Sequence, residues 1–297
     1  MHRKACLIYN PVAGSNNSEQ ELERIKELLC SEFELDIQCT TKEVGADKLA
    51  QEAVNKDFKI IIAAGGDGTI SKTAKALGET TIPLGVIPRG TVNAFASASG
   101  IPDTIDEACK TILSGKTRRI DIGRCNGKLM TLFAGIGFEA ETIDNTSQEA
   151  KKRWGALAYL VPVIQQLRKL ELFEAEIETS DKKISVSAGA ITVANAAPPT
   201  SILAQGPESI IYDDGLLDIT IISSETWISA IATSYQLLKT GLQEDAAKSN
   251  DISYLRTKRV KITTNPPQKI VLDGEIIGHT PLEVECIRDG LTVLVPM

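Results

Sequence analysis

The most constraining stretch of this sequence is an apolar run that ends in glycines. Residues 59–64 read K-I-I-I-A-A, residues 65–69 read G-G-D-G-T, and residues 70–77 have the composition of a helix. A buried strand that passes through glycines into a helix can bind an anion, because the backbone comes close and the first helical N–H groups point toward it. Asp67 suits Mg²⁺ or its bound waters better than a phosphate. The same residues also fit a plain strand-to-helix turn without a ligand.

Strand and helix patterns alternate through the first third of the chain. Apolar runs predict strands at residues 4–9, 35–40, 59–64 and 82–87. Helical patterns cover residues 18–29, 47–55, 70–77 and 103–113. This order indicates a parallel sheet with helices on both faces, whose ligands bind beyond the carboxyl ends of the strands. The residues at those ends are Asn10, Thr41, 65–69 and 89–93.

Short β-rich segments dominate the chain from residue 118 onward. The predicted strands are 119–125, 129–134, 175–179, 184–194, 217–222, 259–264, 269–272, 282–286 and 291–295. Helical patterns at 148–170 and 226–240 interrupt them. Many short strands separated by turn signals indicate an antiparallel sandwich or barrel. We therefore expect two domains, residues 1–117 and residues 118–297, with the active site in the cleft between them.

Composition excludes several classes of protein. The net charge of −7 argues against a nucleic-acid binder, which is normally basic. The six cysteines show no metal-ligand spacing, which favours reduced thiols in a cytosolic protein, and two histidines argue against a Ser/His/Asp triad. No stretch is apolar over a length that spans a bilayer, so a lipid substrate would be met from outside the membrane.

Four further segments carry residues suited to phosphate or proton chemistry. Residues 10–14 read N-P-V-A-G, 88–93 read P-R-G-T-V-N, 212–218 read Y-D-D-G-L-L-D and 272–275 read L-D-G-E. Arg89 can offer a charged fork to phosphate, adjacent carboxylates suit a hard cation, and a glutamate can act as a general base. Each segment alone also fits an ordinary turn, a capped loop or a hairpin.

Together with the G-G-D-G-T loop, these segments resemble the diacylglycerol kinase catalytic-domain superfamily, and above all bacterial lipid kinases of the YegS and DgkB type. The resemblance covers nearly the whole chain, with the motifs in the same order. It implies an α/β N-terminal domain with a parallel sheet (NAD kinase/diacylglycerol kinase-like) and a C-terminal antiparallel β-sandwich domain. It also implies ATP- and Mg²⁺-dependent phosphorylation of a hydroxyl of a lipid such as diacylglycerol or a related glycerolipid.

The resemblance carries roles over to individual residues. The implied nucleotide-binding residues are Asn10, Thr41, Gly65, Gly66, Asp67, Gly68, Thr69, Ile70, Ser71, Gly90, Thr91 and Asn93. The implied metal ligands are Asp67 and Asp214, with backbone carbonyls at Ile211 and Leu216. Glu275 matches the catalytic glutamate and Asp273 accompanies it, while Asp121 matches an acidic position.

Two positions depart from the pattern of the resembling family. Ala94 stands where many relatives have an aspartate of an acidic network, and Arg89 stands where an apolar residue is common. Two alternatives to a lipid kinase stay open. NAD kinase-like small-molecule kinases share the G-G-D-G motif, and a catalytically silent lipid- or nucleotide-binding homologue would fit the loss of an acid at position 94.

A cytoplasmic protein at the inner membrane surface is expected, with peripheral membrane contact to reach its lipid substrate. The basic residues 151–153 precede an aromatic and apolar stretch at 154–161, which fits an interfacial helix or one that packs on the sandwich. The apolar loop 196–203 could also reach a bilayer. Whether the chain forms a homo-oligomer is left open.

Overall fold

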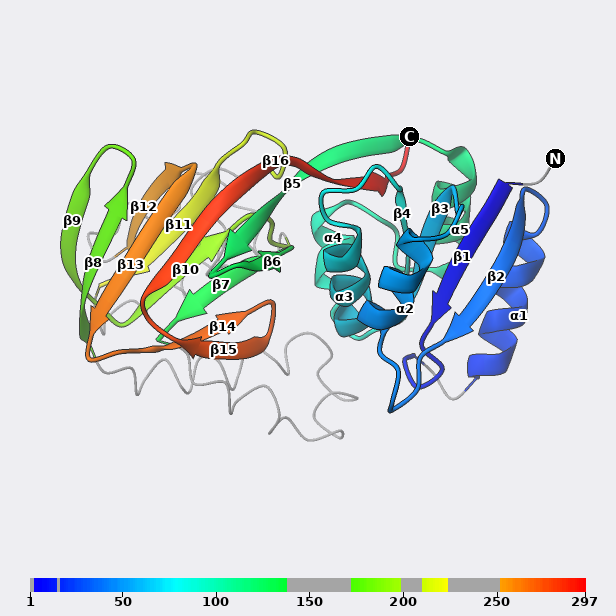
Figure 1. Ribbon diagram of the computed structural model, residues 1–297, viewed down its shortest axis with the longest axis horizontal. Helices are drawn as coiled ribbons and strands as arrows, with labels where there is room; N and C mark the ends of the chain where they lie inside the picture. Colours follow the sequence, from blue (N-terminus) through cyan, green and yellow to red (C-terminus); the bar gives the residue numbers. More distant parts are fainter. Residues whose placement is uncertain (1–2, 15–16, 138–171, 199–209, 224–251) are drawn as a thin grey trace, which may run out of the picture. The chain divides into compact units, whose positions relative to one another are not determined.

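The computed structural model describes residues 3–14, 17–137, 172–198, 210–223 and 252–297 (Figure 1). The chain divides into two compact units. Unit 1 comprises Met1–Ile122, Tyr212–Asp214 and Ile287–Met297, and unit 2 comprises Gly123–Ile211 and Gly215–Cys286. Each unit therefore contains segments that are far apart in the sequence.

Unit 1 is built on a parallel sheet with the strand order β2-β1-β3-β4. These strands are β1 (Arg3–Tyr9), β2 (Phe33–Cys39), β3 (Ile60–Gly65) and β4 (Leu84–Pro88). The end of β16 (Leu282–Leu294) adds a parallel strand beside β4, with Val293 opposite Leu84. Strands β3 and β4 are buried along their whole length, which explains their continuous apolar sequences.

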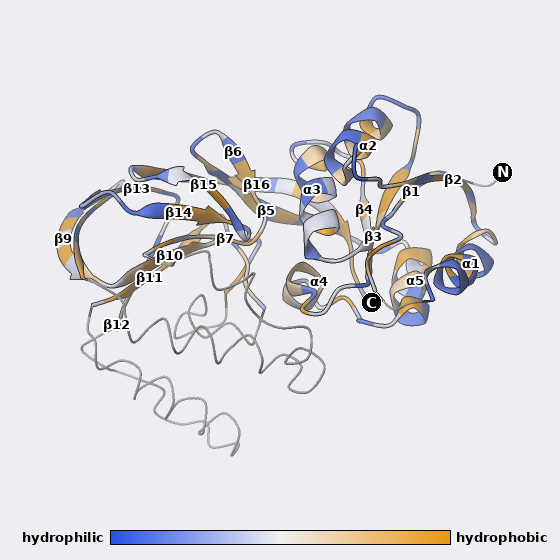
Figure 2. Ribbon diagram, turned by 90° about the horizontal axis from the view of Figure 1, so that it is seen from below, coloured by the Kyte–Doolittle hydropathy of each residue, from blue (hydrophilic) through white to orange (hydrophobic). Residues whose placement is uncertain are grey.

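Helices cover both faces of this sheet (Figure 2). They are α1 (Ser18–Leu29), α2 (Ala46–Val54), α3 (Asp67–Leu77), α4 (Ala94–Ala98) and α5 (Ile105–Ser114). Helices α1 and α5 share one core with alternate residues of β1 and β3, and α2 and α3 lie on the other side of the sheet. The side chain of Thr104 accepts a hydrogen bond from Glu107 N, so Thr104 is the N-cap of α5.

Unit 2 contains antiparallel strands in two sheets. One sheet has the order β12-β11-β10-β7-β14-β15, and the other includes β16-β13-β8-β9 with β5 and β6. The bounds are β5 (Thr117–Cys125), β6 (Lys128–Met130), β7 (Phe133–Ile136), β8 (Phe173–Thr179), β9 (Lys183–Ala188), β10 (Ala190–Ala194), β11 (Leu217–Ile222), β12 (Ile252–Thr257), β13 (Arg259–Asn265), β14 (Lys269–Leu272) and β15 (Glu275–His279). Buried residues of both sheets form a single core. The predicted fold class, an α/β unit and an antiparallel β unit, is confirmed.

Four of the predicted strands are divided or joined differently in the structure. The segment predicted as one strand at 129–134 is β6 and β7, because backbone N–H groups between them bind a carboxylate instead of a neighbouring strand. The segment predicted at 184–194 is β9 and β10, which belong to different sheets and are separated at Gly189. The two strands predicted at 282–286 and 291–295 are the single strand β16.

Some elements were not predicted from sequence, and some predictions fall on residues outside the described ranges. Strands β12 and β15 and the short helix α4 were missed. The helices predicted at 148–170 and 226–240, the basic segment 151–153 and most of the loop 196–203 lie outside the described residues. No helix in the described part of the chain is both long and apolar enough to cross a membrane.

We expect the thiols of the folded protein to differ in reactivity. All six cysteines are free, and Cys30 and Cys39 are exposed. Burial raises the pKa of the Cys6 and Cys109 thiols to about 12. Because the thiolate is the reactive form, iodoacetamide at pH 8 should label Cys30 and Cys39 and spare Cys6 and Cys109, as measured by peptide mass spectrometry.

Labelling in guanidinium chloride provides the control, because all six thiols are then accessible. If the folded protein is alkylated at Cys6 as fast as at Cys30, the burial described for β1 is wrong.

Candidate functional site

The G-G-D-G-T loop leaves open space beside Gly68 at the start of a helix. Strand β3 ends at Gly65, and α3 begins at Asp67, because Gly66 O accepts hydrogen bonds from Thr69 N at 3.0 Å and Ile70 N at 3.1 Å. The helix thus starts three residues before the predicted residue 70. Gly66 is the N-cap and offers no side chain. A Cβ atom at Gly68 would meet no atom within 4 Å. An anion could therefore approach the first N–H groups of α3 without obstruction.

Glycines also allow this loop to touch the loop that follows β4. A Cβ atom at Gly90 would lie 2.9 Å from Gly66 Cα, and one at Gly65 would lie 2.6 Å from Thr69 Cβ. Arg89 N donates to Gly65 O at 2.8 Å. The two loops therefore meet backbone to backbone, and a side chain at Gly65 or Gly90 would force a rearrangement.

The carboxylate of Asp67 joins the same two loops. Its Oδ2 accepts from Asn93 N at 3.0 Å and its Oδ1 accepts from Ala94 N at 2.5 Å, so Asp67 caps the start of α4. Asn93 has a φ of 52°, and its Oδ1 accepts from Gly90 N at 2.8 Å. Ala94, which has no carboxylate of its own, contributes its backbone N–H to this arrangement.

Asn10 connects the N-P-V-A-G turn to α3. Its Nδ2 donates to Thr69 Oγ1 at 2.9 Å, and its Oδ1 accepts from Val12 N at 3.1 Å. Thr41 lies beyond the end of β2, exposed, and its Oγ1 accepts from Val44 N at 3.0 Å in the turn that leads to α2. Asn10 therefore lies in contact with the G-G-D-G-T loop, whereas the Thr41 side chain is bound within its own turn.

The interpretation of Arg89 as a fork for phosphate is corrected by the structure. Its side chain is 1% exposed and is paired with Glu21, at 2.8 Å from Nε and 2.6 Å from Nη2 to Glu21 Oε2. Its Nη1 donates to Asn10 O at 2.6 Å. A buried guanidinium requires a carboxylate nearby, but the burial of Arg89 is a tertiary feature, so the sequence gives no signal for Glu21 as its partner.

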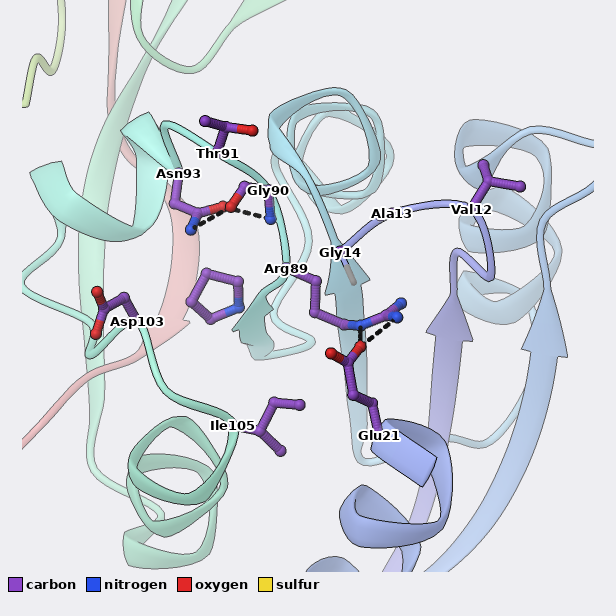
Figure 3. Close-up of a pocket in the computed structure, with 11 residues that line it drawn as sticks. Val12, Ala13, Gly14, Glu21, Arg89, Gly90, Thr91, Asn93, Asp103 and Ile105 are labelled. Atoms are coloured by element: carbon purple, nitrogen blue, oxygen red, sulfur yellow. Dashed lines mark hydrogen bonds and ion pairs between the residues drawn. The ribbon is translucent and has the colours of Figure 1, made fainter. Parts of the chain in front are cut away.

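A pocket of about 670 Å³ opens beside this ion pair (Figure 3). The residues that line it come from the N-P-V-A-G turn, the P-R-G-T-V-N loop and the starts of α1 and α5. Three predicted nucleotide-binding residues are among them, Gly90, Thr91 and Asn93. Figure 3 shows the Arg89–Glu21 pair on the side of the pocket opposite Asp103. The pocket thus adjoins the loop after β4, which in turn touches the G-G-D-G-T loop.

The D-G-E segment of unit 2 forms a two-residue hairpin between β14 and β15. Asp273 and Gly274 have φ values of 47° and 89°, as a tight hairpin turn of the Asp-Gly type requires. Asp273 Oδ2 accepts from Thr131 N at 2.9 Å, and Oδ1 accepts from Leu132 N at 2.9 Å and Phe133 N at 3.1 Å. The carboxylate thus fixes the hairpin onto the segment between β6 and β7. Glu275 follows as the exposed first residue of β15.

The D-D-G segment is a turn before β11. Asp213 is paired with Arg118, whose Nε lies 2.8 Å from Asp213 Oδ2, and Asp214 is half-buried. Asp121 is buried, and its Oδ1 accepts from Asp289 N at 2.9 Å. Among the described residues, no group of three or more His, Cys, Asp or Glu side chains is arranged to hold a metal. The structure therefore does not test the predicted metal ligands, which combine carboxylates with backbone carbonyls.

Two family models together match almost the whole chain. Residues 4–125 match the diacylglycerol kinase catalytic domain, and residues 133–295 match the YegS C-terminal NAD kinase beta sandwich-like domain. The chain belongs to the diacylglycerol kinase family. Membership in this family accounts for the order of the motifs and for the α/β and antiparallel β units.

Individual relatives of this diacylglycerol kinase family member agree with that assignment. The chain is 31% identical to a diacylglycerol kinase of Bacillus subtilis, over 99% of this chain and 97% of the relative. An uncharacterized Synechocystis protein is 46% identical, over 98% of this chain and 70% of its own length. A solved structure of a putative diacylglycerol kinase from Bacillus anthracis has a TM-score of 0.83 and 30% identity, covering 99% of this chain and 97% of that one.

Removing the Asp273 carboxylate from this diacylglycerol kinase family member should destabilise unit 2. Asp273→Ala leaves the N–H groups of Thr131, Leu132 and Phe133 without their acceptor. Because unsatisfied donors cost about 1–3 kcal/mol each and do not add fully, we expect the free energy of unfolding to fall by about 2–4 kcal/mol, measured by urea denaturation.

Asp181→Ala serves as the matched control, since Asp181 is an exposed aspartate in another turn of unit 2. Its effect should stay within about 0.5 kcal/mol. Equal unfolding midpoints for Asp273→Ala and the unchanged protein would show that the carboxylate does not hold the hairpin.

Proposed function

We propose that the protein is an ATP-dependent lipid kinase that transfers the γ-phosphoryl group to a hydroxyl of a lipid such as diacylglycerol or a related glycerolipid. The observation that carries the proposal is the family match over both units, together with the open space beside Gly68 at the start of α3. Among the relatives, the Bacillus subtilis protein is named a diacylglycerol kinase, and one from Alcanivorax borkumensis is named a probable lipid kinase.

The nucleotide phosphates are proposed to bind at the start of α3. The first N–H groups of a helix and its dipole favour negative charge, and groups that are already oriented stabilise charge in the transition state without reorganisation. Gly66 and Gly68 would face the phosphates, with Thr69 beside them in the first turn of α3. The proposed surrounding contacts come from Asn10, Thr41, Gly65, Ile70, Ser71, Gly90, Thr91 and Asn93.

Mg²⁺ is proposed as the accompanying metal. Mg²⁺ is commonly held by one or two carboxylates and by substrate phosphates, so it does not require a large cluster of protein ligands. The residue proposed to lie at this metal is Asp67. Asp214, with the carbonyls of Ile211 and Leu216, is proposed as a metal site that is either the same or a second one. Each Asp67 oxygen accepts one backbone N–H and keeps further acceptor capacity. When bound, the metal would neutralise charge on the transferred phosphoryl group.

Proton transfer is assigned to Glu275. In the proposed step, the lipid hydroxyl oxygen bonds to the γ-phosphorus, the bond to the β,γ-bridging oxygen breaks, and the hydroxyl proton passes to the Glu275 carboxylate. Asp273 would support this step by holding the turn that precedes Glu275, because its carboxylate binds the backbone of residues 131–133. The substrate would be met at the inner membrane surface, through a peripheral contact of a cytoplasmic protein.

A lipid panel with labelled ATP tests this function. The protein should transfer label to at least one of diacylglycerol, phosphatidylglycerol or a sphingoid base, and EDTA should stop the transfer. Glu275→Gln should lower the turnover number by about 10²–10⁴-fold, because a carboxylate base typically contributes that much, while the Kd for ATP stays near that of the unchanged protein.

Glu285→Gln is the matched control, because Glu285 is an exposed glutamate on β16. It should keep full turnover. Wild-type turnover in Glu275→Gln would refute the base assignment, and ATP binding without transfer to any lipid would favour a catalytically silent homologue. Preferential phosphorylation of NAD would support the small-molecule kinase alternative.

Gly68→Ala should weaken nucleotide binding without lowering the stability of the folded protein. The added methyl group meets no protein atom within 4 Å, and Ala favours a helix over Gly, so the folded state should be unchanged or more stable by up to about 1 kcal/mol. The same methyl group would occupy the space assigned to phosphate. We expect the KM for ATP to rise at least about tenfold, which corresponds to about 1.4 kcal/mol of binding free energy.

Gly65→Ala gives the contrasting result, since its methyl group collides with Thr69 and should destabilise the fold. An unchanged KM for ATP in Gly68→Ala would show that the phosphates do not bind at the start of α3.

A further inference from the structure

Arg89 is buried at the junction of three segments that carry proposed nucleotide-binding residues. Its backbone N–H donates to Gly65 O at 2.8 Å, and its side chain pairs with Glu21 in the first turn of α1. The guanidinium carbon lies 4.2 Å from the centre of the Tyr9 ring. Arg89 therefore contacts the ends of β1 and β3 as well as the start of α1.

The N-P-V-A-G turn lies directly against this ion pair. Arg89 Nη1 donates to Asn10 O at 2.6 Å. At Gly14, where φ is 87°, an added Cβ atom would lie 3.2 Å from Glu21 Oε2 and 3.3 Å from Arg89 Nη2. Both ends of the turn, Asn10 and Gly14, are therefore in contact with the pair.

The contacts continue from the turn to the G-G-D-G-T loop. The Asn10 carbonyl accepts from Arg89, and the Asn10 side chain donates to Thr69 Oγ1 at 2.9 Å in the first turn of α3. A displacement of Arg89 would shift Asn10 and, through it, the first turn of α3. Small errors in position are costly where several N–H groups must converge on one ligand.

We propose that Arg89, paired with Glu21, is a positioning residue that sets the nucleotide affinity by holding the N-P-V-A-G turn against the G-G-D-G-T loop. The inference rests on the proposed function, since it assigns the nucleotide to these loops. Arg89 itself is not assigned as a phosphate ligand, because its side chain is 1% exposed and each of its three nitrogens already donates to Glu21 or to Asn10 O.

The test uses the full chain with the double substitution Arg89→Met and Glu21→Met. Both charges are removed together, so no unpaired charge stays buried and the protein should fold, whereas Arg89→Met alone leaves Glu21 without its partner. In the double variant, amide hydrogen exchange at residues 10–14 should be faster. The Kd for ATP, measured by calorimetry, should rise by about 10- to 100-fold.

Arg24→Met is the matched control. Arg24 forms an exposed pair with Asp106 between α1 and α5, and its loss should change neither the exchange of residues 10–14 nor the Kd for ATP. A lower melting temperature with an unchanged Kd would indicate a role in stability alone and would overturn the proposal.

The remaining outcomes show whether the positioning role of Arg89 or the proposed function itself is wrong. Unchanged exchange at residues 10–14 in the folded double variant overturns the positioning role, whatever the affinity. If the unchanged protein itself does not bind ATP, the proposed function fails, and the nucleotide role of Arg89 fails with it. Faster exchange together with weaker ATP binding supports the inference.

Discussion

The close approach of Gly66 and Gly90 is the constraint on which the rest of unit 1 depends. The two loops meet backbone to backbone because position 90 carries no side chain, since an added Cβ at Gly90 would lie 2.9 Å from Gly66 Cα. This contact lets the Asp67 carboxylate reach the N–H groups of Asn93 and Ala94. It also places Arg89 within reach of the turn after β1. The open face at the start of α3 follows from the same arrangement.

Asp67 and Asp273 have the same structural role in the two units. Each is an aspartate next to a glycine, and each binds backbone N–H groups of a segment far away in the sequence. Charged acceptors form stronger hydrogen bonds than neutral ones, so a single carboxylate can fix a loop that has no hydrophobic core of its own. The proposed functional residues of both units therefore lie on loops tied down by acid-to-backbone contacts.

Much of this arrangement could be predicted from local sequence patterns, because strands and helices leave periodic patterns and turns are marked by glycine. The helix at 18–29 and the strand at 269–272 were predicted with the bounds they have in the structure. Contacts between distant segments leave no such signal. The pairing of Arg89 with Glu21 and the binding of residues 131–133 by Asp273 depend on tertiary structure, so the break between β6 and β7 was missed. The partition of β9 and β10 between two sheets is also a tertiary feature.

Unit 1 contains segments from both ends of the chain, which limits the order in which the protein can fold during synthesis. Strand β4 is flanked on one side by β3 and on the other by the end of β16, where Val293 lies opposite Leu84. Leu291, Val293 and Leu294 are buried. A ribosome must therefore translate all of unit 2 before it delivers the strand that covers the edge of the first sheet. Until then, β4 exposes unpaired backbone groups, and a chain released early would carry an open sheet edge that can pair with other chains.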